Sequence, residues 1–446
     1  MKWILSKNLT VALLFTSSLV SFDVEEYEEN HKKDISITIL VHGIISVAPY
    51  INFSNIIKFM QDKIANTTYS RSIEQTRRDP YFYQHHPMQE LGLRKIDRGN
   101  NRPGAAATAY AQLLDMLAPH PNKSIEHHYY TFGWSGLLSP RIRYLEAKIF
   151  YDQMLKEFEH FFNNDHYNVK IHIIGYSHGA NVALKLAEVY KKEGYDKTKK
   201  IIVDELILMG APILPETDYL LNSSLFKKVY HFYSYGDRVQ RLDFFSLDRV
   251  FSNRKFHDRS DFSVPEKIVQ INIKIKRATK GRKNPSSYSL EELIHRRSTQ
   301  RNSDPGHTEL WSFGWSPASY RDTFPLYPLP VGVFIPVIIS KLQETMPDAK
   351  NLMVELHPDY EAMLFYDFDK KYEKITPFVD KKTMCHLKTH AEQFRPDESF
   401  NRLKYEKKVK KSIRQANKEQ FGTWKERRAS CKKTKGCLPV QECPQC

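Results

Sequence analysis

The chain has 446 residues, of which 41% are hydrophobic and 13% aromatic, so it can bury a large core. This composition excludes an intrinsically disordered protein. The formal net charge is +15, but residues 402–446 hold 14 Lys and Arg against 4 Asp and Glu, which supplies +10 of that charge. The basic character therefore belongs mainly to a C-terminal tail and says little about the body of the chain.

The N-terminus has the features of a secretory signal peptide. Lys2 and Lys7 give it a positive start, residues 9–20 are mostly apolar, and glutamates between positions 25 and 29 end the apolar stretch. Such a stretch is too short to span a bilayer comfortably as a mature helix. We expect residues 1–21 to be cleaved off and the protein to be secreted or periplasmic; an uncleaved membrane anchor is the alternative.

Strand-like and helix-like segments then alternate, which predicts an α/β fold with a mainly parallel sheet and helices on both of its faces. The first strand is expected over residues 35–41, a β-branched run that ends at His42 and Gly43. A second strand is expected over 127–132. A long helix should follow it, with Ser139 as its cap and a proline in the first helical position.

The next strand, expected over 169–174, runs directly into the sequence Gly-Tyr-Ser-His-Gly, and an amphipathic helix is expected over 180–190. A serine on a tight strand-to-helix turn projects its hydroxyl above the sheet, and the turn needs glycines because side chains there would clash. This context predicts Ser177 as a nucleophile, with Gly175 and Gly179 as the glycines of the turn. The backbone N–H of the following residue, His178, is then one expected donor to an oxyanion.

A serine hydroxyl also needs a base and a group that orients the base. Asp237 follows the strand expected over 229–234, and His307 follows the last strand of this region, expected over 268–275 and near an edge because its apolar residues alternate. The order Ser, Asp, His along the chain therefore predicts these two residues as the partners of the serine. The alternatives are Asp204, Asp218, Asp243, His257 and His295; Asp204 and His257 are disfavoured because each precedes its strand.

A second oxyanion donor is expected in the loop that follows the first strand. Gly43 would let the backbone approach the serine closely, and the N–H of Ile44 would be the donor. The side chain of His42 is expected to order this loop and not to act as a base. Further along, residues 70–104 are irregular and polar and form a candidate cap or lid.

With these residues assembled, the chain resembles lipase-like members of the α/β-hydrolase superfamily. The stretches that carry the resemblance are LVHGI at 40–44, IIGYSHGA at 173–180, LMGAPI at 208–213, YSYGDRV at 233–239 and PGHTEL at 305–310. The resemblance implies an eight-stranded hydrolase domain over 34–345, a Ser177-Asp237-His307 triad and hydrolysis of carboxylic esters, lipids included, through an acyl-enzyme, with no cofactor and no metal. A thioesterase or amidase would use the same groups. A hydrolase fold that has lost activity and only binds is the alternative from another class.

Residues 346–401 form an extension to which the sequence assigns no role. The basic tail, 402–446, predicts attachment to an anionic membrane or envelope surface, and export argues against nucleic acid as a partner. Its clustered cysteines predict disulfides in an exported protein, whereas zinc binding is the rival interpretation. These cysteines are Cys431, Cys437, Cys443 and Cys446.

Overall fold

The computed structural model describes residues 32–45, 64, 67–78, 84–118, 125–192, 201–239, 253–278, 289, 300–315, 324–396, 407, 411 and 414–415. Several sequence predictions lie outside these residues: the signal peptide, Asp243, His295 and the four cysteines of the tail. Within the described residues, no helix is long and apolar enough to cross a bilayer.

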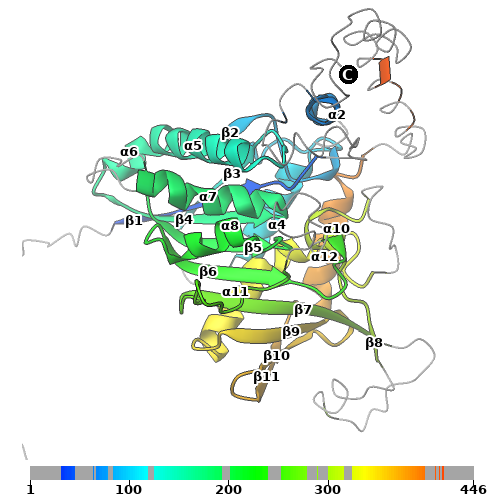
Figure 1. Cartoon of the computed structure of the whole chain (residues 1–446). Helices are drawn as coiled ribbons and strands as arrows, with labels where there is room; N and C mark the ends of the chain where they lie inside the picture. The colour runs from blue at the N-terminus through cyan, green and yellow to red at the C-terminus, as the bar shows by residue number, and fades with distance from the viewer. Residues whose placement is uncertain are drawn as a thin grey trace, which may run out of the picture.

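A mainly parallel sheet forms the centre of the molecule, as predicted (Figure 1). In the described part its strands follow one another in the order β11-β10-β9-β7-β6-β5-β4-β1-β3-β2, and β8 pairs with β7 beside this path. The seven strands from β9 to β3 are parallel, whereas β2, β8, β10 and β11 pair antiparallel with their neighbours. The strands are β1 (Lys33–Val41), β2 (Gly92–Lys95), β3 (Glu126–Gly133), β4 (Tyr167–Tyr176), β5 (Val203–Met209), β6 (Phe226–Tyr233), β7 (Ile268–Ala278), β8 (Gln300–Asn302), β9 (Asn351–His357), β10 (Ala362–Asp367) and β11 (Tyr372–Pro377).

Helices cover both faces of the sheet. One face packs against α5 (Pro140–Glu157) and α7 (His178–Lys192), and the other against α4 (Ala106–Leu117), α11 (Ile335–Thr345) and α12 (Lys381–Glu392). The predicted cap of α5 is present: the Ser139 hydroxyl accepts a hydrogen bond from the Ile142 N–H at 3.0 Å. The remaining helices and 3₁₀ turns are α2 (Thr68–Arg77), α6 (Glu159–Phe162), α8 (Pro215–Asp218), α10 (His307–Trp311), η1 (Tyr219–Asn222), η4 (Val331–Phe334) and η5 (Pro358–Tyr360).

Two details of the sheet differ from expectation. In the described residues the sheet has eleven strands, ten along its path and β8 beside it, against the eight that the resemblance implies, because residues 351–377 of the C-terminal extension add β9, β10 and β11. For the same reason β7 lies inside the sheet, between β6 and β9, and the prediction of an edge strand is wrong. One of its polar residues is satisfied inside the protein: the buried side chain of Gln270 accepts a hydrogen bond from the N–H of Phe256 and donates one to its carbonyl.

The candidate cap or lid is in part an addition to the sheet, since β2 within residues 70–104 pairs with β3.

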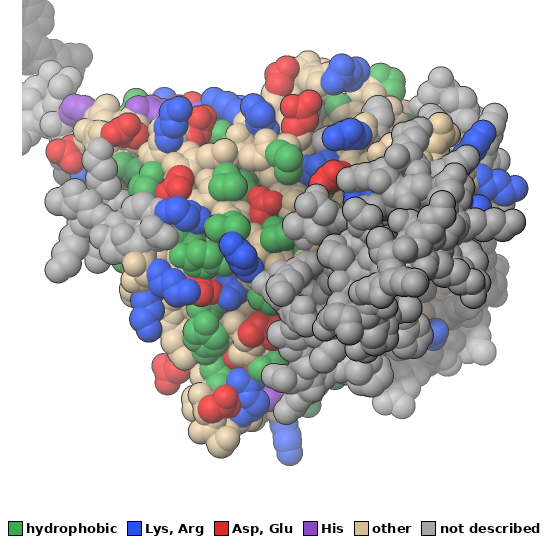
Figure 2. Space-filling view, turned by 45° about the horizontal axis from the view of Figure 1, so that its top comes forward, with side chains coloured by type: hydrophobic (Ala, Val, Ile, Leu, Met, Phe, Trp, Pro, Cys, Tyr) green, Lys and Arg blue, Asp and Glu red, His purple; other side chains and the backbone are tan. Residues whose placement is uncertain are grey.

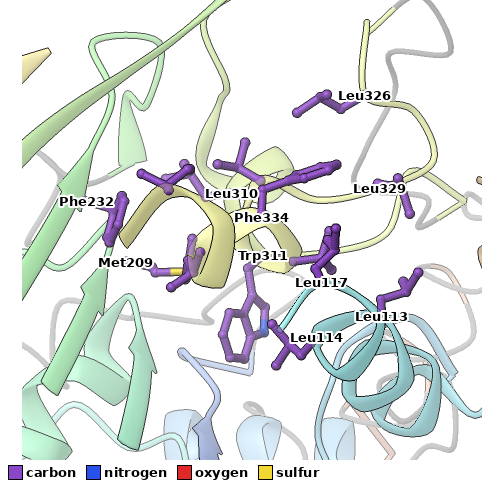
Figure 3. Packing of buried hydrophobic residues seen from close by; sticks show 14 of the residues in the cluster. Leu113, Leu114, Leu117, Met209, Phe232, Leu310, Trp311, Leu326, Leu329 and Phe334 are labelled. Carbon is purple, nitrogen blue, oxygen red and sulfur yellow. The ribbon is translucent and has the colours of Figure 1, made fainter. Parts of the chain in front are cut away.

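The surface of the body carries charges of both signs, interspersed over the face shown in Figure 2. The core on the α4 side reaches α10, where Leu310 and Trp311 pack among Met209, Phe232 and the leucines of α4 (Figure 3). This packing fixes α10, and with it His307, against the carboxyl ends of the strands.

Candidate active site

Ser177 occupies a strained turn between β4 and α7. Its φ of 52° is in the left-handed region, which is uncommon for a residue with a side chain. The neighbouring glycines are needed sterically: a Cβ on Gly175 would lie 2.7 Å from the Cα of Ala180, and one on Gly179 would lie 2.2 Å from the carbonyl oxygen of His42. The Ser177 N–H donates to the Met209 carbonyl at 2.9 Å, which ties the turn to the end of β5. The hydroxyl is thus presented from a rigid position.

The structure brings together the three side chains that the chain order had singled out. The Nε2 atom of His307 lies 3.0 Å from the Oγ of Ser177, and its Nδ1 lies 2.7 Å from the Oδ2 of Asp237. Asp237 is fully buried, and Ser177 is only 3% exposed. Because an ionised carboxylate can only accept, the Nδ1–H donates to Asp237, which leaves Nε2 free to accept the serine proton.

Close backbone packing holds the Asp–His pair in place. Gly210 has a φ of 55°, and a Cβ there would lie 3.0 Å from the Asp237 carboxylate. A Cβ on Gly236 would lie 2.7 Å from the carbonyl oxygens of Asp304 and Pro305, so the turn before Asp237 touches the loop before His307. Because neither glycine has a side chain, segments that are distant in the chain can pack against one another here.

Tyr176 is a further contributor that sequence reasoning treated only as a variable position of the serine motif. Its hydroxyl donates to the carbonyl oxygen of His307 at 2.9 Å. Its ring stacks on Trp311 with the centroids 5.2 Å apart and lies 4.8 Å from the His307 ring. Tyr176, the residue before Ser177, thus positions the backbone of His307.

The loop after β1 lies directly against Ser177, as predicted. A Cβ on Gly43 would be 2.8 Å from the Cβ of Ser177. The His42 ring donates from Nδ1 to the Gly43 carbonyl at 2.6 Å, and its Nε2 accepts from the Trp134 N–H at 3.1 Å and faces an Arg77 nitrogen at 2.9 Å. Since a trans peptide is planar, fixing that carbonyl also fixes the N–H of Ile44, which points the opposite way.

The protonation state of His42 agrees with this ordering role. Burial, followed by the charge of Arg77, holds the pKa of His42 well below its ordinary value. The ring is therefore neutral, with one nitrogen as donor and the other as acceptor. The His42 carbonyl in turn accepts from the indole N–H of Trp134 at 2.6 Å. His42 thus serves the loop, and Arg77 and Trp134 are contacts that the sequence did not reveal.

His178 begins α7, where backbone N–H groups have no partner within the helix and the helix dipole favours negative charge. Its side chain is engaged by another helix: Nδ1 lies 3.1 Å from a guanidinium nitrogen of the buried Arg143. Burial and the charge of Arg143, with a smaller effect of His307, hold the pKa of His178 well below its ordinary value. The backbone N–H is thus the group of His178 that fits an oxyanion.

The described alternatives to Asp237 are engaged elsewhere. Asp204 pairs with Lys227 at 2.6 Å and accepts from the Ile171 N–H. Asp218 forms an ion pair with Arg259. His257, the described alternative to His307, is exposed and precedes β7, as the sequence indicated.

Comparison with models of known protein families finds none that matches this chain. Comparison with curated proteins finds no significant match either.

The Gly43–Ser177 contact makes a specific prediction. In Gly43→Ala the added methyl group would displace the loop from the nucleophile, and kcat should fall about 10²- to 10³-fold, as when one oxyanion donor is lost. KM should change little, because the donor acts on the transition state. Steady-state kinetics with a soluble ester measure kcat and KM, and a thermal unfolding curve shows whether the variant is folded.

Gly99→Ala is the matched control for this variant. Gly99 is an exposed turn residue whose added Cβ would meet only the Asp97 side chain, at 3.3 Å. Its activity and melting temperature should equal those of the wild type. An unchanged kcat in Gly43→Ala would contradict the role given to this loop.

Proposed function

We propose that this chain is a serine hydrolase with an α/β-hydrolase fold that cleaves carboxylic esters through an acyl-enzyme on Ser177. One observation carries the proposal: the imidazole of His307 bridges Asp237 and Ser177 with hydrogen-bond distances on both sides. The fold supports it, because Ser177 follows β4, Asp237 follows β6 and His307 follows β7 and the short β8, in the order Ser, Asp, His that such hydrolases use. The extra strands β9 to β11 would then be an addition to that fold.

The proposed reaction follows from the placement of the groups. His307 accepts the Ser177 proton at Nε2 while Oγ attacks the ester carbonyl carbon, and the carbonyl electron pair moves onto oxygen. The backbone N–H groups of Ile44 and His178 stabilise this oxyanion. Asp237 keeps the imidazole in the required tautomer and stabilises its positive charge. His307 then protonates the departing alcohol, and water, activated by the same imidazole, releases the acid and restores the serine.

Labelling with a fluorophosphonate tests the proposal directly, since this probe reacts with activated serines. The wild type should be labelled on the peptide that contains Ser177, as mass spectrometry of a digest would show. Ser177→Ala should not be labelled, whereas Ser223→Ala should react as the wild type does, since among the described residues the Ser223 hydroxyl contacts only the Leu225 N–H, from which it accepts a hydrogen bond. Equal labelling of wild type and Ser177→Ala would refute the assignment.

The same active protein can then define the substrate. Hydrolysis of p-nitrophenyl esters of increasing acyl length distinguishes an esterase, which prefers short soluble chains, from a lipase, whose rate rises steeply with long chains at an interface. Matched thioester and anilide substrates test the two related activities. If a folded protein hydrolysed none of these substrates and the probe did not label it, the alternative of an inactive hydrolase fold that only binds would be favoured.

A further inference from the structure

The turn that carries Asp237 is contacted by an arginine from the next described segment of the chain. Asp237 follows β6, and the described residues stop at Val239 and resume at Asn253. The guanidinium of Arg254 donates to the Asp237 carbonyl oxygen from Nη2 at 2.7 Å and from Nε at 3.3 Å. Nη2 also donates to the Tyr235 carbonyl oxygen at 3.4 Å, and the guanidinium lies 5.6 Å from the centre of the Tyr235 ring. Arg254 therefore contacts the turn both before and at Asp237.

These contacts hold the backbone of Asp237 on both sides of its Cα atom. The Asp237 N–H donates to the Ser234 carbonyl oxygen at 3.2 Å, and the Asp237 carbonyl accepts from Arg254. Because each peptide is planar, the first bond orients the peptide before the Asp237 Cα and the second orients the peptide after it. With both peptides held, the direction of the Cα–Cβ bond is held as well. The position of the carboxylate that meets His307 thus depends on Arg254.

The backbone around Arg254 is itself anchored to the two strands that flank β6 in the sheet, β5 and β7. Asn253 exchanges two backbone hydrogen bonds with Ile213, at 3.1 and 3.3 Å, in the segment that follows β5. The Phe256 N–H donates to the buried Gln270 side chain of β7 at 2.7 Å, and the Phe256 carbonyl accepts from it at 3.1 Å. Arg254 lies between these two anchored residues, so its side chain extends from a fixed backbone.

A second arginine of the same segment makes contacts of another kind. Arg259 forms an ion pair with Asp218 and lies 3.0 Å from Asp261, so its charge faces carboxylates. The contacts of Arg254 with the turn are instead made to backbone carbonyl oxygens. A charged donor makes a stronger hydrogen bond than a neutral one, and the planar guanidinium presents its N–H groups in a fixed geometry. Arg254 is thus suited to fix a backbone, and Arg259 to neutralise acids.

We propose that Arg254 is a positioning residue of the candidate active site, which holds the Asp237 backbone so that the carboxylate stays within hydrogen-bond distance of His307 Nδ1. This inference rests on the function proposed for Ser177. Arg254 acts through Asp237 and exchanges no proton, because a guanidinium stays charged in proteins. A displacement of about 1 Å at a catalytic group can lower a rate about 100-fold. Loss of Arg254 should therefore reduce kcat.

Steady-state kinetics of Arg254→Ala test this role with a soluble p-nitrophenyl ester. We expect kcat to fall about 10- to 100-fold and KM to change little, because Asp237 acts through His307 on the transition state. Arg254→Lys, which restores a cationic donor without the planar fork, should recover part of the loss. Ethylguanidinium at millimolar concentration should raise kcat of Arg254→Ala and leave the wild type unchanged, since it supplies the missing donors.

Arg259→Ala is the matched control, because it removes the other described guanidinium of this segment that binds a neighbouring turn. Its melting temperature should fall, whereas its kcat should equal that of the wild type and should not respond to ethylguanidinium. A folded Arg254→Ala with wild-type kcat would overturn the proposal. An equal loss of kcat in the two variants would also overturn it, since the loss would then reflect general destabilisation.

Proton NMR tests the same contact without any substrate. The Nδ1 proton shared by His307 and Asp237 should give a resonance far downfield, which its absence in His307→Ala assigns. In Arg254→Ala this resonance should shift, or broaden through exchange with water, and in Arg259→Ala it should keep its wild-type position. An unchanged resonance in Arg254→Ala would overturn the proposal. Failure of a fluorophosphonate to label the wild type would contradict the function proposed for Ser177, but the NMR comparison would still decide whether Arg254 holds Asp237.

Discussion

Replacement of His307 by alanine should lower kcat for ester hydrolysis by about 10⁴- to 10⁶-fold, close to the effect of removing the nucleophile itself. The imidazole is the only group within hydrogen-bond reach of the Ser177 hydroxyl in the described residues, at 3.0 Å. Without it the serine proton has no acceptor, and the departing alcohol has no proton donor. Labelling by a fluorophosphonate should become correspondingly slow. Stopped assays at high enzyme concentration, with a circular dichroism spectrum to verify folding, measure the loss.

Two other histidines provide the controls for this variant. His257→Ala alters an exposed residue ahead of β7 and should retain wild-type turnover. His295→Ala addresses the substitute that the sequence allowed, and it too should retain turnover. A large loss in His295→Ala with near-normal activity in His307→Ala would show that the histidine has been assigned wrongly.

Most of the parallel sheet could be predicted from sequence because its strands are buried on both faces. Buried strands form apolar runs, and the carboxyl-terminal halves of β1, β4 and β5 are such runs, which made these strands visible in the sequence. The strands of the extension were not. In β9 the buried Glu355 lies 3.3 Å from Lys276 of β7, and the exposed strand β11 is mostly polar. In the sequence alone, a buried polar residue whose partner lies on a neighbouring strand cannot be distinguished from a polar residue on the surface.

The candidate site divides in the same way. Ser177 was visible because a turn of this kind imposes glycines at fixed spacing, and His307 followed from the order of strands along the chain. The supporting contacts were not visible, because each depends on a meeting of distant segments. Arg77 reaches His42 from α2, and Arg143 reaches His178 from α5. Neither arginine has a local pattern that distinguishes it from a solvent-exposed helical residue.

Asp237→Asn should reduce kcat by about 10⁴-fold and leave KM nearly unchanged. The Asp237 carboxylate is fully buried and accepts the Nδ1–H of His307 at 2.7 Å, which leaves Nε2 unprotonated toward the serine. An asparagine amide in the same place can donate its N–H₂ to Nδ1, so that the ring proton moves to Nε2. The imidazole would then donate to Ser177 when it should accept from it. Steady-state kinetics of the purified variant, with a thermal unfolding curve, measure the effect.

Asp218→Asn is the matched control, because Asp218 is also a buried carboxylate and was an alternative candidate for the same role. Both of its oxygens face Arg259, one of them at 3.3 Å from Nη2, and His307 is not among its contacts in the described residues. Losing the charge should lower the free energy of unfolding by about 1–3 kcal/mol and leave kcat nearly unchanged. The two variants should therefore behave differently: Asp237→Asn should lose turnover, and Asp218→Asn should lose stability. If Asp218→Asn abolished turnover in a folded protein while Asp237→Asn kept it, the acid that orients the base would have been misassigned.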